Sequence, residues 1–323
     1  MRVRLLAAIF VTLAGFVTIH AQIQNPPDTR NAALRYWIAF AEMQDIPADK
    51  ATQELLEKMV AGETAWGEKT VTPILDANRT AIQMMQRATK LPECDWGLEY
   101  SQGARASIAY APRARALARL NTLEGMRQLA AGDSAAAVNT WLSGVRFSQD
   151  LARGGSLIFT LMSKATLLPN LRELKEAAVR RKLSDAEKKQ ASALIRALPE
   201  DGFDWGAAWG IEAAGLEQFL HELQTAPDPG ATYAAIMGSP APKDGLHPTV
   251  QDIHTYNEYM LSVQSALREP PGKAKTLLDA LEAKRAGLNE VEQNITPNPQ
   301  KSNLSRTEVM TARTELLQAL SSK

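Results

Sequence analysis

Apolar residues recur along the chain at intervals of three and four positions, the spacing that places them on one face of an α-helix. No stretch shows a convincing alternation of apolar and polar residues, as a half-buried strand would. Strong helix formers, above all Ala, Leu, Glu, Lys, Arg and Gln, dominate the composition. The pattern predicts an all-α protein with helices over residues 29–44, 49–61, 71–90, 112–131, 134–153, 156–181, 184–198, 205–224, 249–268, 273–294 and 304–320.

Short polar or glycine-containing connections separate most of these segments, so successive helices are expected to pack as antiparallel hairpins. Such hairpins build either an α-solenoid similar to the tetratricopeptide arrays or an irregular bundle. Pro169 lies inside the segment 156–181 and predicts a kink there. Residues 226–248 are rich in proline and glycine and are predicted to form a long irregular loop.

A short motif occurs twice and suggests that the chain has two related halves. Residues 91–97 read Leu-Pro-Glu-Cys-Asp-Trp-Gly, and residues 198–206 read Leu-Pro-Glu-Asp-Gly-Phe-Asp-Trp-Gly. An Arg-Ala pair ends the predicted helix before each copy, and the second copy is two residues longer. The repeat predicts an N-terminal helical half over 22–182 and a C-terminal helical half over 183–323.

The predicted hairpin over residues 117–151 carries small residues and one aromatic residue at a recognisable spacing. These residues are Gly125, Gly132, Ala137, Trp141 and Gly144. The segment resembles one tetratricopeptide unit, in which small residues let two helices approach closely. It lacks the usual aromatic residues of the first helix and the closing proline. The chain as a whole resembles exported all-helical bacterial proteins of uncharacterised function, a resemblance that implies no activity.

The N-terminus has the features of a secretory signal peptide. Arg2 and Arg4 precede an apolar run over residues 5–19, and Ala21 suits the last position before cleavage. We therefore expect residues 1–21 to be a signal peptide and the mature chain to be periplasmic or extracellular. If the run were retained, the protein would instead be a membrane-tethered assembly factor. No later segment is long and apolar enough to predict a membrane span in the mature chain.

Charge and cysteine content narrow the classes of partner. The chain holds 36 basic and 36 acidic residues, and this balance gives it no overall attraction to nucleic acid. Cys94 is the only cysteine, so an internal disulfide is excluded. We expect Cys94 to behave as a small buried apolar side chain, with a reactive thiol as the alternative. No motif predicts a cofactor.

The two Asp-Trp-Gly corners allow a structural and a chemical interpretation. Asp95 and Asp204 are placed to cap a following helix, while Trp96 and Trp205 could cover the preceding one. In the alternative, Trp96 and Trp205 are binding residues, and carboxylates act in pairs beside these aromatic platforms, as in glycan hydrolysis, where the two groups lie roughly 5–10 Å apart. The candidate pairs are Asp95 with Glu99 and Glu200 with Asp204.

A cluster of arginines is the best candidate for a binding surface. Arg113, Arg115 and Arg119 follow one another on one predicted helix, and Arg115 and Arg119 share a face of it. Such a cluster suits an acidic partner, or else forms a solvated face paired with glutamates. His247 and His254 are the best pair for a metal, although each fits a surface hydrogen bond better. The sequence thus favours an exported helical scaffold that binds a protein or a cell-envelope polymer, with a hydrolase as the competing class.

Overall fold

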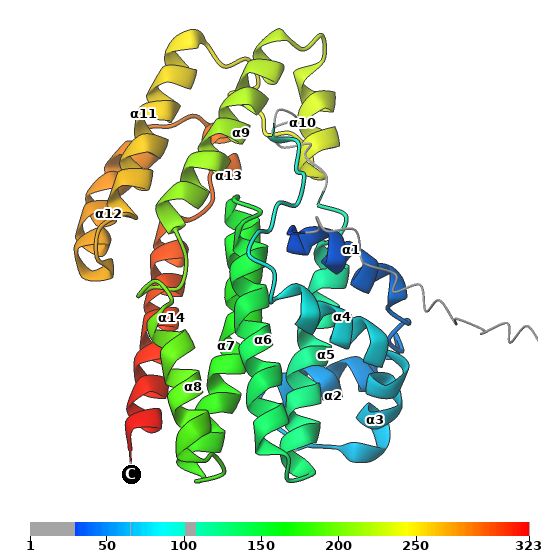
Figure 1. Ribbon diagram of the computed structural model, residues 1–323. Coiled ribbons are helices and arrows are strands. Elements are labelled where there is room, and N and C mark those ends of the chain that lie inside the picture. The colour runs from blue at the N-terminus through cyan, green and yellow to red at the C-terminus, as the bar shows by residue number, and fades with distance from the viewer. Residues whose placement is uncertain (1–29, 65, 101–107, 323) are drawn as a thin grey trace, which may run out of the picture.

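The computed structural model describes residues 30–64, 66–100 and 108–322, and its regular structure there is entirely helical (Figure 1). The helices are α1 (Ala32–Glu42), α2 (Lys50–Ala61), α3 (Glu68–Ala77), α4 (Arg79–Ala88), α5 (Ala111–Ala130), α6 (Ser134–Ala152), α7 (Leu157–Val179), α8 (Asp185–Arg196), α9 (Trp205–Thr225), α10 (Pro229–Met237), α11 (Val250–Ala266), α12 (Pro271–Ala286), α13 (Glu290–Ile295) and α14 (Pro299–Ser321). The all-α prediction is therefore confirmed. The predicted signal peptide, residues 1–21, lies outside the described residues.

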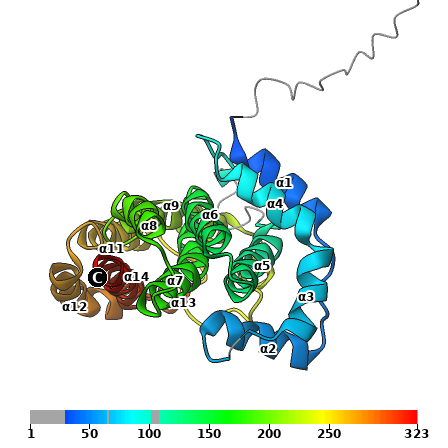
Figure 2. The same ribbon diagram turned by 60° about the horizontal axis from the view of Figure 1, so that its bottom comes forward.

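Three long helices, α5, α6 and α7, form the centre of the molecule (Figure 2). Small residues let them approach closely. A Cβ atom on Gly125 of α5 would lie 2.3 Å from the indole nitrogen of Trp141, which belongs to α6. One turn further along α6, a Cβ on Gly144 would lie 2.5 Å from the Asn170 side chain of α7. The contact between Gly125 and Trp141 agrees with the close helix approach expected for this hairpin, while its relationship to tetratricopeptide repeats stays a prediction.

Two hydrophobic clusters hold the helices together. The first contains buried residues of α1, α2, α3 and α4 together with residues of α5, α6 and the start of α7. The second contains buried residues of all the helices from α8 through α14, together with other residues of α6 and α7. Helices α6 and α7 therefore contribute to both clusters and connect the N-terminal and C-terminal parts of the chain. The division into related halves at residues 182 and 183 stays a prediction.

The observed helices depart from the predicted ones at a few places. The helix predicted over 71–90 is divided into α3 and α4 at Asn78, whose buried amide accepts the backbone N–H of Gln44 and donates to the carbonyl of Ile74. Residues 226–248 are not irregular throughout, because α10 begins at Pro229 inside them. Helix α7 runs through Pro169 as one element.

The two Asp-Trp-Gly corners differ in structure. Asp204 accepts the backbone N–H of Ala207 and caps α9, as predicted. The same prediction is wrong for Asp95, whose carboxylate accepts the N–H of Gly97, because the next described helix begins only at Ala111. The backbone of the first corner instead lies beside the residue that precedes α1, because Glu93 and Asn31 form an isolated β-bridge.

Within the described part of the chain, we find no helix that combines the length and the apolar character required to cross a membrane.

Candidate functional site

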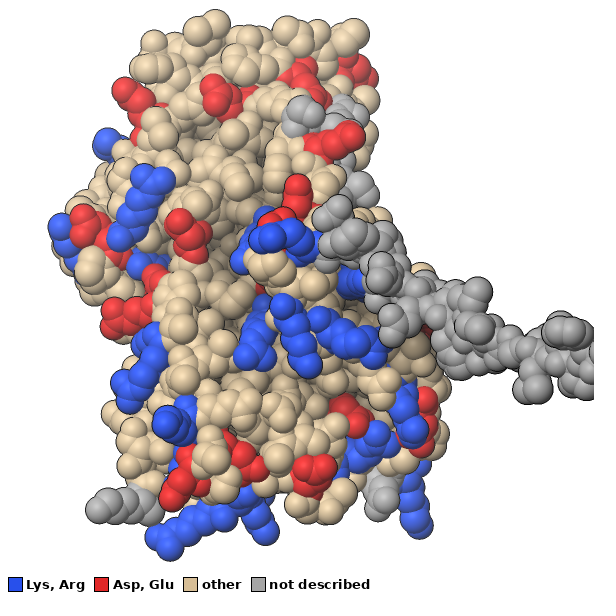
Figure 3. Space-filling model, viewed as in Figure 1, with Lys and Arg blue, Asp and Glu red and all other residues tan. Residues whose placement is uncertain are grey.

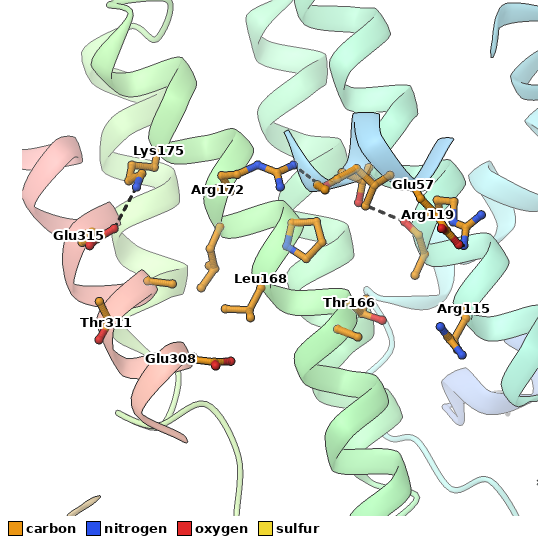
Figure 4. Close-up of a pocket in the computed structure, with 18 of the residues that line it drawn as sticks. Glu57, Arg115, Arg119, Thr166, Leu168, Arg172, Lys175, Glu308, Thr311 and Glu315 are labelled. Carbon is orange, nitrogen blue, oxygen red and sulfur yellow. Dashed lines mark hydrogen bonds and ion pairs between the residues drawn. The ribbon is translucent and has the colours of Figure 1, made fainter. Parts of the chain in front are cut away.

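A groove of about 800 Å³ lies between four helices that are far apart in the sequence. Helix α7 lies between α14 on one side and α5 with α2 on the other (Figure 2), and all four helices line the groove (Figure 4). Its apolar lining comprises Val60, Ala61, Ala118, Ala165, Leu168, Pro169, Leu171 and Ala312. Pockets of this size with mostly apolar walls and a few polar groups are typical of ligand and peptide sites.

Charged side chains surround this apolar lining, and its carboxylates are paired. Glu57 lies 3.4 Å from a guanidinium nitrogen of Arg119. Across the groove, Glu315 lies 2.9 Å from the ammonium of Lys175. The third carboxylate, Glu308 of α14, forms an ion pair with Lys164. The acidic groups of the groove are therefore neutralised by neighbouring cations.

Arg172 fixes one wall of the groove. Its guanidinium donates to the carbonyl of Val60 at the end of α2 and is 2.8 Å from the carboxylate of Glu173. Gly62, which ends α2 with φ +76°, leaves room for this side chain, since a Cβ atom there would lie 2.8 Å from the Arg172 Nε atom. The contact holds the end of α2 against α7 on one side of the groove.

The arginine cluster predicted from the sequence lies at this groove. Arg115 is exposed and lines both the groove and an adjoining cavity of about 410 Å³. Arg119 lines both spaces too, and Arg113 lines the second one, where it donates to the carbonyl of Met43 at 3.2 Å. Within the described residues, the Arg115 guanidinium has no ion pair, whereas Arg113 and Arg119 each lie beside a carboxylate. The groove therefore carries an excess of positive charge at Arg115.

The predicted catalytic carboxylates do not line this groove. Asp95, Glu99, Glu200 and Asp204 are exposed, and Asp204 is engaged as the cap of α9.

The two tryptophans offered as binding residues are buried, which corrects that expectation. The Trp96 indole donates to the carbonyl of Asp150 at 2.8 Å and stacks on Tyr110 with ring centroids 4.4 Å apart. The Trp205 indole donates to the carbonyl of Asp201 at 3.0 Å. Neither ring presents a face on which a sugar could stack.

The predicted metal pair finds little support in the structure. His254 lies 3.5 Å from Glu258, one helical turn away on α11, which is the surface pairing that the sequence also allowed. His247 is exposed in the segment between α10 and α11. Among the described residues, no three His, Cys, Asp or Glu side chains come together in a way that could hold a metal ion.

A buried polar cluster beneath α1 had no signal in the sequence. The Tyr36 hydroxyl donates to the Asp150 carboxylate at 2.5 Å, and burial raises the pKa of Asp150 to about 6. The Cys94 thiol lies 3.7 Å from the backbone carbonyl of Asp150, and burial raises its pKa to about 12. A thiol with such a pKa is protonated and unreactive at neutral pH, in agreement with the structural interpretation of Cys94.

Comparison of the chain with protein-family models, with characterised proteins and with solved structures found no match.

Proposed function

We propose that this chain is a non-enzymatic, exported binding protein whose groove between α2, α5, α7 and α14 receives an acidic, partly apolar helical segment of a partner protein. The observation that carries the proposal is the position of Arg115 at the rim of an apolar groove of about 800 Å³. Its guanidinium is exposed and has no ion pair with any residue that the structure describes. The apolar lining would bury one face of the segment, and Arg115 would pair with its carboxylate.

Charge and shape favour a peptide over the other partners considered. An anionic envelope polymer would satisfy Arg115, but it would leave the apolar lining of the groove without a counterpart. Glycan hydrolysis would require two carboxylates facing one space, whereas Glu57, Glu308 and Glu315 are each paired with a cation. A binding role uses both features of the groove.

Site-specific photo-crosslinking in cells that produce the protein tests the proposal. A photoreactive residue at Thr311, in the groove, should yield a discrete crosslinked species to a protein. The same residue at Thr276, exposed on α12, is the control position and should not. Arg115→Glu should reduce the Thr311 crosslink at least about tenfold, since it replaces an attractive charged contact with a repulsive one.

A matched pair of substitutions separates recognition from folding. Since Arg115 makes no ion pair in the described residues, Arg115→Gln and Arg115→Glu should both keep the unfolding free energy of the unsubstituted chain within about 0.5 kcal/mol. A Thr311 crosslink that survives Arg115→Glu unchanged, or one that is equally strong at Thr276, would refute the proposed site.

A further inference from the structure

Helix α1 is apolar on both of its faces, although it lies at the surface. Its inner face packs in the core through Ala33, Tyr36 and Phe40. Its outer face carries Leu34, Trp37 and Ile38, which are 50%, 42% and 43% exposed. These three positions follow the i, i+3, i+4 spacing and form one continuous stripe. Arg35 is the one charged residue of α1 before its last residue, Glu42. No other described element of this chain covers the exposed part of the stripe, and an exposed apolar patch of this kind is typical of an interaction surface.

Basic side chains lie next to this stripe. Helix α4 packs alongside α1 at the outer edge of the molecule (Figure 2). Arg87 in its last turn and Lys90, two residues after its end, are both exposed. A cavity of about 210 Å³ joins the two helices, and both Ile38 and Arg87 line it. Figure 3 shows basic side chains gathered across the middle of this side of the molecule. An apolar stripe bordered by cations is complementary to a surface that is apolar inside and anionic outside.

The acidic groups near the stripe do not cancel this charge. Glu93 is occupied by Arg30, whose Nε lies 2.7 Å from its carboxylate. Glu42 ends α1, one turn beyond Ile38. Neither Arg87 nor Lys90 has an ion pair within the described residues.

The position of α1 in the chain points to the same kind of surface. The apolar run over residues 5–19 precedes α1 with only residues 20–31 between them, and this connection can span at most about 40 Å. Among the described residues, α1 is the first helix after the run that the sequence predicts to be a signal peptide.

We propose that the outer face of α1, with Arg87 of α4 and Lys90 just after it, rests on the anionic headgroups of a lipid bilayer. Leu34, Trp37 and Ile38 enter the boundary between headgroups and acyl chains, where tryptophan is favoured, and the two cations contact lipid phosphates. This surface is separate from the groove, which lies among α2, α5, α7 and α14, so a docked molecule keeps the groove free for a partner.

Vesicle binding by the full-length chain provides the test, and it must distinguish α1 from the upstream apolar run. Vesicles of phosphatidylcholine with equal phosphatidylglycerol, bearing brominated acyl chains, should quench part of the tryptophan fluorescence. That quenching should be lost in Trp37→Phe. The apolar run holds no tryptophan, and Trp96, Trp141, Trp205 and Trp209 are buried. The remaining tryptophan, Trp66, is half-buried between α2 and α3, away from the α1 stripe, so quenching that is lost in Trp37→Phe reports on α1 and not on insertion of the run.

Charge variants give a second, quantitative readout. Arg87→Gln combined with Lys90→Gln should weaken partitioning onto the anionic vesicles roughly 20-fold at low salt. The control combines Lys182→Gln with Lys284→Gln, which removes the same charge from exposed positions elsewhere and should leave partitioning nearly unchanged. Both variants should unfold at the same temperature as the parent chain.

Four results would overturn the proposal. The first is equal partitioning of the parent chain and the Arg87 and Lys90 variant. The second is Trp37 quenching that is as strong with pure phosphatidylcholine as with the anionic mixture. The third is a concentration-dependent dimer that shields Trp37 without lipid, which would assign the stripe to a second copy of the chain. An acidic polypeptide that displaces the vesicles would likewise assign it to a protein.

Discussion

The buried ion pair between Arg306 and Asp201 connects α14 to the corner before α9. Replacing Arg306 should therefore lower the free energy of unfolding of the protein. The Arg306 side chain is 3% exposed and that of Asp201 is 21% exposed. Two guanidinium nitrogens each lie 2.8 Å from the Asp201 carboxylate, and one of them also donates to the carbonyl of Glu269 at 2.8 Å. Arg306→Met keeps most of the side-chain volume but removes all of these contacts.

The expected cost follows from the charge that is left behind. Breaking a buried ion pair from one side costs about 3–5 kcal/mol, because the remaining charge stays buried without a partner. One fifth of the Asp201 side chain reaches solvent, so water offsets part of this penalty and we expect a loss of about 3 kcal/mol. Adding Asp201→Asn to Arg306→Met removes the stranded charge and should recover roughly 1–2 kcal/mol.

Urea unfolding followed by far-ultraviolet circular dichroism measures both values. The single and double variants should keep the slope of the parent transition and differ in its midpoint. A loss below about 1 kcal/mol for Arg306→Met would show that the pair contributes no more than an exposed one. Additive costs of the two substitutions would contradict the coupling on which the argument depends.

Three further predictions concern other contacts. Gly125→Ala should cost about 1–3 kcal/mol in urea unfolding, because its Cβ would lie 2.3 Å from the buried Trp141 indole nitrogen. Asp204→Ala should lower the unfolding free energy by about 1 kcal/mol through loss of the α9 cap. Because Asp95 caps no described helix, Asp95→Ala should lower it by less, as measured by thermal unfolding of both variants. Asp150 has a folded-state pKa of about 6, above the value of about 3.9 in an unfolded chain, so its ionisation destabilises the fold as pH rises from about 4 to 6. Asp150→Asn should therefore gain stability relative to the parent chain over that interval, and parallel pH profiles would contradict the assignment.

Local signals were sufficient to predict most of the helices. Ser184 forms a capping box with Glu187 at the start of α8, where a Ser-x-x-Glu sequence favours one. Gly62 and Gly132 follow α2 and α5 with positive φ angles. The division at Asn78 was missed because its cause is tertiary. Its side chain turns inward to accept the N–H of Gln44, 34 residues away, and no proline or glycine marks the position.

The groove was harder to anticipate than the helices. Its lining runs from Glu57 to Glu315, so its existence depends on the packing of α14 beside α7, which no local pattern specifies. Only Arg113, Arg115 and Arg119 gave a signal, since they cluster within one helix. Folding brings Asp45 to Arg113 and Glu57 to Arg119, whereas Arg115 receives no carboxylate from the described residues.

The repeated Leu-Pro-Glu and Asp-Trp-Gly motif shows how a small sequence difference redirects similar residues. The two extra residues of the second copy correspond to the interval that contains Asp201 and Gly202. Asp201 binds Arg306, and Gly202, with φ +86°, comes so close to α14 that a Cβ atom would lie 2.6 Å from Val309. The first copy lacks these residues and lies beside the start of α1, with Trp96 turned into the aromatic core. The insertion therefore accounts for why one corner docks the C-terminal helix while the other supports α1, the helix whose outer face we assign to a membrane surface.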